Sequence, residues 1–457
     1  MNTWVRAEIL ARFLHWRLTW DHRNTQLAPP ESVAHNPKFM SAWDAAGLIP
    51  DGALLADSGL ACTQRCCIMY WAIQERFQQT GHPRDLSLVG VGGHGGRGKV
   101  PGTLEELGIE GLVTRFFTGH TETYKSFLKL AEAGKCEMQV IPQGTLALLL
   151  EAQGEGRDHL ISDTGAGTAF DPRTGRGTPL APSDAPQYVT STEDGLLRWT
   201  IPPVTAAIFN VPAADAQGNL YVKNAAMIAE AREIARAARR NGGIAIANVG
   251  LLVDAGYDEI FLRHDEVDAI VYDPNTEQTG SVPHRRYWDF LTPNSSLDVK
   301  EGMARVLFIN RLVGVTPVRK PAELAMARLA AAIYTDHARP GGIVDIGVGL
   351  PEEVARMLHE HGVLDQVTPM TETGVIGGMA APGIYFGSAV NPTEIVSSAE
   401  AFRRMYKHLD AVILGMLEAD GDGNVNVSKR GEGPMNYVGP GGFVDITRCA
   451  DSIIFIG

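Results

Sequence analysis

One glutamate in the second half of the chain stands among small residues, in a pattern that suits chemistry on a bound ligand. Glu372 is the only acid in the run Thr371-Glu-Thr-Gly-Val-Ile-Gly-Gly378. The segment 364–370 before it is expected to form a short strand, and ligand chemistry in parallel α/β sheets gathers at the carboxyl ends of strands. A carboxylate placed there could act as a base or as a nucleophile. Taken alone, a surface glutamate without a chemical role explains the pattern more simply.

Two glycine-containing runs resemble ligand-binding loops, but each lacks a residue that such a loop would need. Residues 93–99 fit the spacing GxxxxGK of a phosphate-binding loop, yet Val100 stands where Ser or Thr would hold magnesium. We therefore expect a glycine loop close to a bound ligand, following a strand over 86–91. Residues 420–424, Asp-Gly-Asp-Gly-Asn, are similar to a calcium loop, but Val425 replaces the required glycine. A polar hairpin turn is the preferred interpretation, and no metal site is expected.

The composition limits the class of protein. The 457 residues suggest two or three domains, and the formal net charge of −13 argues against nucleic acid as a partner. The apolar runs are too short for a membrane span. The five cysteines form no CxxC pair, which favours a reducing compartment and a cytoplasmic location. Cys62, Cys66 and Cys67 crowd one stretch that could bind a metal, but buried small apolar residues are the preferred interpretation.

The first 40 residues are expected to form a helical extension. Val5, Ile9, Phe13, Trp16 and Trp20 recur at spacings that place them on one face of a helix. We expect this face to pack on the first domain or on a second subunit, because an exposed apolar stripe of this size is unfavourable. Its arginine-rich character leaves two alternatives open, a membrane-surface role and a role in organelle targeting.

Alternating strand-like and helical runs must position these residues. A helical apolar stripe spans 227–238, Asn241-Gly-Gly243 ends it, and the apolar run 244–249 is typical of a buried strand. This alternation predicts an α/β fold with largely parallel sheets flanked by helices.

A double internal repeat indicates two related domains. Residues 50–60 match 340–350 at Pro, Gly, Gly and Leu, and residues 206–219 match 411–424 at Asp, Gly and Asn. We place the first domain at 41–314 and the second at 315–457, with the active site between them. Glu372 is then expected to face first-domain loops such as 91–100 or 165–168.

Several motifs in one order resemble family I coenzyme A transferases, in particular the single-chain acetate/propionate/3-oxoacid branch. They are the Glu372 run, Ile346-Gly-Val-Gly-Leu-Pro351, Gly383–Asn391, Gly439-Pro-Gly-Gly-Phe-Val-Asp-Ile446, Pro142-Gln-Gly144, Ile161–Thr168 and Asp171-Pro-Arg173. The resemblance covers roughly residues 45–457 and implies a CoA-transferase/NagB-like fold.

The resemblance also implies the chemistry and its partners. Glu372 would carry CoA between an acyl-CoA and a small carboxylic acid in a ping-pong reaction, with backbone N–H groups near Gly441 and Gly442 stabilising the oxyanions. Coenzyme A thioester would be a substrate rather than a resident cofactor, and a homo-oligomer is expected. The residues assigned to substrate or CoA binding are Gly347, Gly349, Gln143, Gly377, Gly378, Asn391 and Lys429.

The sequence departs from the family pattern in three places. Asp345 stands where the family has an oxyanion-donating Asn; an ionised Asp would repel the oxyanion, and a protonated Asp could donate only with a strongly raised pKa. Residues 57–61 hold fewer glycines than the family loop, and 453–457 resemble a strand after which related chains continue. The nucleophile itself is expected to have a pKa that is not raised far. An acyl-CoA hydrolase and an inactive binding homologue remain the alternative functions.

Overall fold

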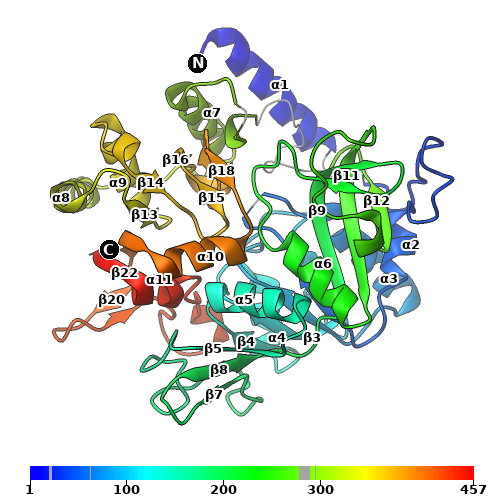
Figure 1. Cartoon of the computed structure of the whole chain (residues 1–457), viewed down its shortest axis with the longest axis horizontal. Coiled ribbons are helices and arrows are strands. Elements are labelled where there is room, and N and C mark those ends of the chain that lie inside the picture. The colour runs from blue at the N-terminus through cyan, green and yellow to red at the C-terminus, as the bar shows by residue number, and fades with distance from the viewer. Residues whose placement is uncertain (20–22, 62, 277–288, 294) are drawn as a thin grey trace.

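A computed structural model describes residues 1–19, 23–61, 63–276, 289–293 and 295–457. Trp20, Cys62 and the side chain of Trp16, which entered the sequence predictions, lie outside the described part. The described chain forms two sheets of mainly parallel strands with helices on both faces (Figure 1). The predicted α/β architecture is confirmed.

The larger sheet is built from strands between residues 54 and 272. The part of the chain before residue 315 is called the first half below, and the part from residue 315 onward the second half. Its strands run in the order β12-β11-β9-β1-β2-β3-β4-β6, with β10 beside β9. All neighbours are parallel except β6 and β10. The bounds are β1 (Leu54–Asp57), β2 (Leu86–Gly90), β3 (Val113–Thr118), β4 (Glu137–Val140), β6 (Pro179–Ala181), β9 (Ala206–Asp215), β10 (Leu220–Tyr221), β11 (Ile244–Val253) and β12 (Ala269–Tyr272).

Helices cover both faces of this sheet, which explains why its central strands are apolar throughout. The helices α2 (Ala42–Ala46), α3 (Cys67–Thr80) and α4 (Lys125–Glu132) share one core cluster with one face. On the other face, α5 (Gln143–Gly154) and α6 (Ala231–Arg240) lie side by side (Figure 1). A small sheet of β5 (His159–Ser162), β8 (Leu197–Thr200) and β7 (Val189–Ser191) lies beyond α5.

The second half of the chain repeats the plan on a smaller scale. Four parallel strands run in the order β14 (Thr368–Pro369), β13 (Ile343–Ile346), β19 (Leu409–Gly415) and β22 (Ala450–Ile456). The helices α8 (Pro321–His337) and α9 (Pro351–Glu360) pack on one face, and α10 (Ser398–Lys407) and α11 (Phe443–Cys449) on the other. Three two-stranded antiparallel pairs complete it: β15 (Val375–Ile376) with β18 (Glu394–Ile395), β16 (Met379–Ala380) with β17 (Ala389–Val390), and β20 (Glu418–Ala419) with β21 (Val425–Asn426).

The repeated turns have the same hydrogen bonds in both halves. Asp215 Oδ1 accepts from the Gln217 and Asn219 N–H groups, and Asp215 Oδ2 accepts from the Asn219 side chain. Asp420 makes the same three contacts with residues 422 and 424. Residues 420–424 are therefore the polar hairpin turn that was predicted.

The N-terminal helix joins the two halves. α1 (Thr3–Thr19) lies beside α7 (Val299–Leu312) at one end of the molecule (Figure 1). Ile9 is buried in a cluster that includes Ala226 from the first half and Val390 from the second, and Val5 and Phe13 pack against it. The apolar face thus packs within its own chain. No described helix is long and apolar enough to cross a membrane.

We predict that Ile9→Ala lowers the free energy of unfolding by about 2–4 kcal/mol, because it leaves a cavity between the two halves. The matched control is Leu18→Ala on the same helix, where the side chain is 73% exposed and the change is expected to stay within about 0.5 kcal/mol. Denaturant unfolding measures both. Equal losses in the two variants would contradict the packing of α1 on α7.

Candidate active site

Glu372 lies in the tight turn between β14 and β15, directly after a strand of the smaller sheet. The turn is closed by the Thr371 N–H, which donates to Val375 O at 2.9 Å, and by a 2.8 Å hydrogen bond between the Thr371 and Thr373 hydroxyls. The Glu372 carboxylate lies against Gly442, where any Cβ would overlap it. Glycine at 442 therefore leaves room for this close approach, and its N–H faces the carboxylate.

Two further carboxylates are buried next to Glu372. Asp345 comes from β13 and Asp445 from α11, and both charges act on Glu372. Burial raises the pKa of Asp345 to about 7 and the pKa of Asp445 to about 6. Burial, followed by the charges of Asp345 and Asp445, raises the pKa of Glu372 well above its usual range. The expectation that the Glu372 pKa is not raised far is therefore wrong, because sequence spacing did not reveal the two neighbouring acids.

The three acids differ in their hydrogen-bond partners. Asp445 accepts from the Gly144 and Thr145 N–H groups at 2.9 Å, from the Thr145 hydroxyl at 3.0 Å and from the Tyr406 hydroxyl at 2.9 Å. Asp345 Oδ2 is buried without a partner among the described residues. Donors favour the charged form and an apolar site favours the neutral one. Asp445 is consequently the best placed of the three to carry a negative charge, and Asp345 to carry a proton.

The side chain of Gln143, next to Gly441, holds a hydrogen-bond donor that has no partner among the described residues. Its backbone N–H donates to Gly441 O at 2.9 Å, and its side chain is buried. A Cβ at Gly441 would lie 3.8 Å from the Gln143 Oε1, while the Gln143 Nε2 has no partner among the described residues. Buried amides are normally satisfied, so this free N–H indicates a place for an acceptor from a ligand. The N–H of Gly441 is already used, because it donates to Gly119 O at 2.8 Å.

Some predicted ligand-binding residues have other roles in the fold. A Cβ at Gly377 would overlap the Thr393 side chain, and one at Gly378 would overlap the backbone of Val390. Asn391 has a left-handed backbone, and its amide donates to Leu297 O. Packing of the antiparallel pairs thus accounts for these residues, and a ligand contact for them stays a prediction.

Three other predicted residues lie on more open segments. Gly349 has φ of +95° and nothing within 4 Å of a built Cβ, and its carbonyl accepts from Arg319 at 2.6 Å. The Gly347 N–H donates to Ile413 O at 2.8 Å. Lys429 forms a 3.0 Å ion pair with Glu432. None of these contacts involves Glu372.

That Glu372 faces the loops 91–100 or 165–168 stays a prediction, because the contacts described for these loops do not include Glu372. In residues 91–100, a Cβ at Gly92 would lie 3.6 Å from Gln143 Oε1, so this loop supports Gln143. A Cβ at Gly165 would instead lie 3.2 Å from the Trp199 ring. Gln143, Gly144 and Thr145 are thus first-half residues that lie next to the carboxylates or to the segment beside them. Asp445 and Phe402, which packs against Gly144 and Gly442, were not singled out from the sequence.

The run 93–99 does not present a phosphate cradle. The Gly96 and Gly98 N–H groups both donate to Glu105 Oε2, at 2.8 and 2.7 Å. A carboxylate of the chain itself thus occupies the position that a phosphate would take in such a loop. Nearby, Asp57, the first residue of the segment 57–61 that holds fewer glycines than the family loop, accepts from the Tyr70 hydroxyl and pairs with His94 Nδ1, both at 2.8 Å.

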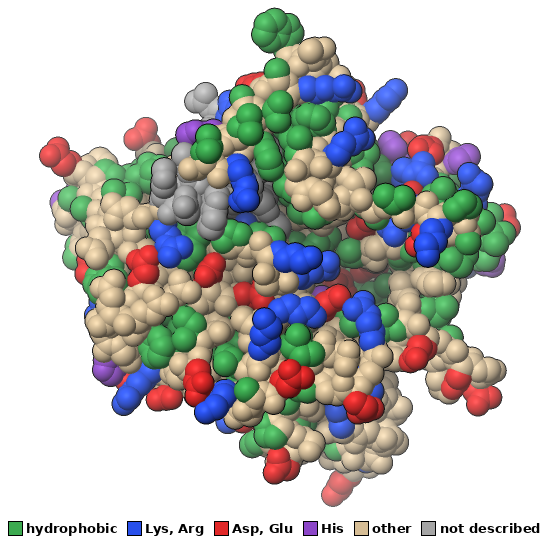
Figure 2. All heavy atoms as spheres, turned by 180° about the vertical axis from the view of Figure 1, so that it is seen from behind, with side chains coloured by type: hydrophobic (Ala, Val, Ile, Leu, Met, Phe, Trp, Pro, Cys, Tyr) green, Lys and Arg blue, Asp and Glu red, His purple; other side chains and the backbone are tan. Residues whose placement is uncertain are grey.

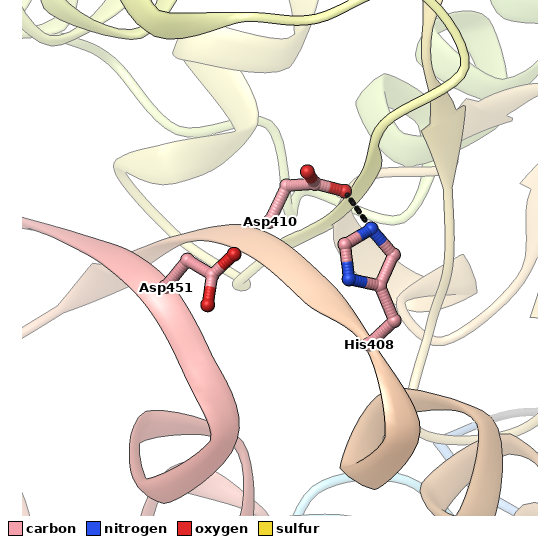
Figure 3. A group of neighbouring side chains, drawn as sticks. All are labelled: His408, Asp410 and Asp451. Atoms are coloured by element: carbon pink, nitrogen blue, oxygen red, sulfur yellow. Dashed lines mark ion pairs between the residues drawn. The ribbon is translucent and has the colours of Figure 1, made fainter.

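A separate group of possible metal ligands lies away from Glu372. His408, Asp410 and Asp451 present ligand atoms within 4.8 Å of one another (Figure 3). They stand at the amino ends of β19 and β22, whereas Glu372 follows the carboxyl end of β14. Asp410 Oδ2 already accepts from the Ile343 N–H at 2.7 Å and pairs with His408 Nε2 at 2.9 Å. These contacts explain the group as an anchor for the start of β13.

Comparisons with known proteins place the chain among enzymes that handle CoA. It is 29% identical over 438 residues to the caffeate CoA-transferase of Acetobacterium woodii, covering 92% of this chain and 78% of that protein. It is 29% identical over 440 residues to the acetate CoA-transferase YdiF of Escherichia coli K12, covering 94% and 77%. No protein-family model matches the chain.

The structural comparison agrees with the sequence comparison. The solved acyl-CoA transferase YdiF of E. coli O157:H7, described as a thioester complex with CoA, superposes with a TM-score of 0.78 at 27% identity, covering 94% of this chain and 82% of that one. Fold and sequence therefore define an enzyme of the CoA-transferase class. The chain is similar to coenzyme A transferases, as its motifs predicted.

The buried carboxylates lead to a prediction about how the free energy of unfolding depends on pH. Asp345 holds its proton to about pH 7 in the folded chain, whereas an unfolded Asp releases it near pH 4. The free energy of unfolding should therefore fall as pH rises between these values, by up to about 4 kcal/mol from this group. In Asp345→Asn, the loss of melting temperature between pH 5 and pH 8 should be clearly smaller than in the parent protein.

Asp365→Asn is the matched control, since that carboxylate is exposed. It should keep the parental dependence on pH. If Asp345→Asn keeps it too, Asp345 is not protonated in the folded protein at neutral pH.

Proposed function

We propose that the protein transfers CoA between an acyl-CoA and a free carboxylic acid through a glutamyl-CoA thioester on Glu372. The observation that carries this proposal is the position of the Glu372 carboxylate, which lies against the Gly442 N–H, one residue from the Gly441 carbonyl that accepts from the Gln143 backbone N–H. The CoA-transferase class of its relatives, and the thioester complex described for one of them, support it.

The reaction has two halves with the same bonds made and broken. A Glu372 oxygen attacks the thioester carbonyl, the C–S bond breaks, and CoA thiolate leaves an acyl-glutamyl anhydride. The thiolate then attacks the glutamyl carbonyl, the C–O bond breaks, and the first carboxylic acid leaves as its anion. A second carboxylate reverses these steps and takes CoA with it. No water is consumed, so the thioester energy is kept.

Each attack creates an oxyanion that needs hydrogen-bond donors. The Gly442 N–H and the Gln143 Nε2 are the two donors best placed in the described part of the chain, because the Gly441 N–H already donates to Gly119 O. Loss of one such donor typically costs about 2.7–4 kcal/mol of transition-state stabilisation. The assignment of Gln143 as a donor extends its predicted role in substrate binding.

Incubation with acetyl-CoA should add CoA, less one water, to the intact mass of the protein. Glu372→Ala and Glu372→Gln should abolish the adduct and lower acyl exchange by orders of magnitude, since neither side chain offers a carboxylate nucleophile. Borohydride should reduce the thioester and block activity. Mass spectrometry of intact protein and of its peptides measures all three, and Glu360→Gln, on the exposed side of α9, is the control that should keep the adduct.

Two outcomes would contradict the proposal. An adduct that survives Glu372→Ala would place the nucleophile elsewhere. Loss of the thioester to water, with little transfer to an added carboxylic acid, would favour the hydrolase alternative.

The position of Asp345 next to Glu372 leads to a prediction about the rate of CoA transfer. Glu372 must be ionised to attack, so kcat/KM should rise with pH through the raised pKa of Glu372. Asp345→Asn removes a charge that raises this pKa, and it supplies a neutral donor. Asp345 is charged only above its pKa of about 7, so we expect exchange to increase mainly at pH 7 and above, by up to about a hundredfold. An unchanged or lower rate in a pH-rate profile would mean that Asp345 has its own role and that the Asn comparison is wrong.

A further inference from the structure

Three cations from distant parts of the sequence meet at one place on the surface. The backbone N–H of Arg97 donates to Thr123 O at 2.9 Å, which brings Arg97 close to Lys125 at the start of α4. Arg430, from the loop after β21, forms a 2.9 Å ion pair with Glu122. The site therefore joins the glycine loop after β2, the start of α4 and a loop of the second half.

Most of the positive charge there is unpaired. In the described ranges, Arg97 and Lys125 have no ion-pair partner, and the Arg430 guanidinium has only Glu122. The chain as a whole has a net charge of −13, so free acids are plentiful elsewhere. Lysine and arginine side chains also gather across the middle of the face opposite α5 and α6 (Figure 2). Three cations that share a single counter-charge, Glu122, indicate a site for a further anion.

The charges converge on the His120 imidazole. Burial lowers the pKa of His120 to about 4; the charge of Glu122 acts against this, and the charges of Arg97, Lys125 and Arg430 lower it further. For Glu122, burial raises the pKa, but the hydrogen bond from Arg430 and the charge of Arg97 outweigh it and lower the pKa. Glu122 is thus ionised and is the internal anion of this site.

The cations lie within reach of Glu372. A Cβ at Gly439 would lie 2.9 Å from the His120 Cα, and three residues further along the chain Gly442 meets the Glu372 carboxylate. The backbone between them spans at most about 11 Å. An extended thioester arm of that length or more, with its sulfur at Glu372, would put a charged distal end beside Arg97, Lys125 and Arg430.

We propose that Arg97, Lys125 and Arg430 bind the phosphate groups of the CoA substrate, and that Glu122 holds Arg430 until those phosphates displace it. The proposal rests on the proposed function and adds the residues that recognise the nucleotide half of CoA. It also gives Glu122 the role of an anion that competes with the phosphates for Arg430. Substitutions of Glu122 and of Arg430 should therefore change the KM for acetyl-CoA in opposite directions.

The test compares substrates with and without phosphates. Arg430→Gln and Lys125→Gln should raise KM for acetyl-CoA roughly tenfold or more, because a hydrogen bond to a charged group is lost, and should leave KM for acetyl-pantetheine unchanged. Glu122→Gln should lower KM for acetyl-CoA, because it frees Arg430. Arg356→Gln on α9, an arginine in ion pairs with Glu353 and Glu360, is the matched control and should change neither.

The outcomes separate this proposal from the proposed function. Equal KM increases for both substrates, or increases of the same sign in Glu122→Gln and Arg430→Gln, would overturn the phosphate site and leave a structural ion pair. Calorimetry with free CoA tests binding without catalysis, and Arg430→Gln should weaken it by a similar factor. If CoA binding weakens in this way but no adduct ever forms on Glu372, the phosphate site stands and the covalent mechanism fails.

Discussion

The Asp445 carboxylate at the amino end of α5 is the contact on which the arrangement of the two halves depends. The first N–H groups of any helix lack partners within it. In α5 they are satisfied from the other half of the chain, by Gly441 O and by Asp445, 300 residues away. Breaking this contact would leave buried donors without acceptors, at about 1–3 kcal/mol each. The same contacts hold Gln143 next to Gly441, and Gly442 then meets the Glu372 carboxylate.

This fastening has an electrostatic cost at the reacting group. A carboxylate buried beside Glu372 opposes the ionisation that nucleophilic attack requires, and Asp345 adds to the effect. The donors around Asp445 keep its charge where the fold needs it, whereas the partnerless oxygen of Asp345 favours a proton. The site therefore combines one acid that holds structure, one that stores a proton and one that reacts. Active sites commonly hold acids whose environments separate their pKa values in this way.

The sequence predicted local structure better than it predicted contacts between distant segments. The strand at 86–90 and the turn at Asp420 follow from apolar runs and from short-range side-chain hydrogen bonds, so they were recognisable. The helix expected from residue 227 begins at Ala231, because apolar spacing does not reveal where a loop ends. Asp445 was quoted only as a letter within a motif, since nothing local shows that its acceptors serve a helix in the other half.

Glycine was an ambiguous guide to the site. Gly442 leaves room for Glu372 to approach its backbone, whereas Gly377 and Gly378 are needed because the antiparallel pairs pack on them. The sequence shows glycine in both cases and does not distinguish a ligand-facing position from a packing position. The raised pKa of Glu372 was missed for a related reason: burial and like charges are properties of the assembled site, and neither appears in the spacing of residues along the chain.

One hydrophobic core continues from the first half into the second. The cluster under α5 and α6 includes Ala147 and Ile234 together with Met370, Phe402 and Val412. The interior between the sheets is therefore shared, and neither half can close its core alone. Heating should melt both sheets in one cooperative transition, with equal calorimetric and van't Hoff enthalpies. Separately expressed halves would expose this apolar surface and would be expected to aggregate or, when mixed, to reassemble.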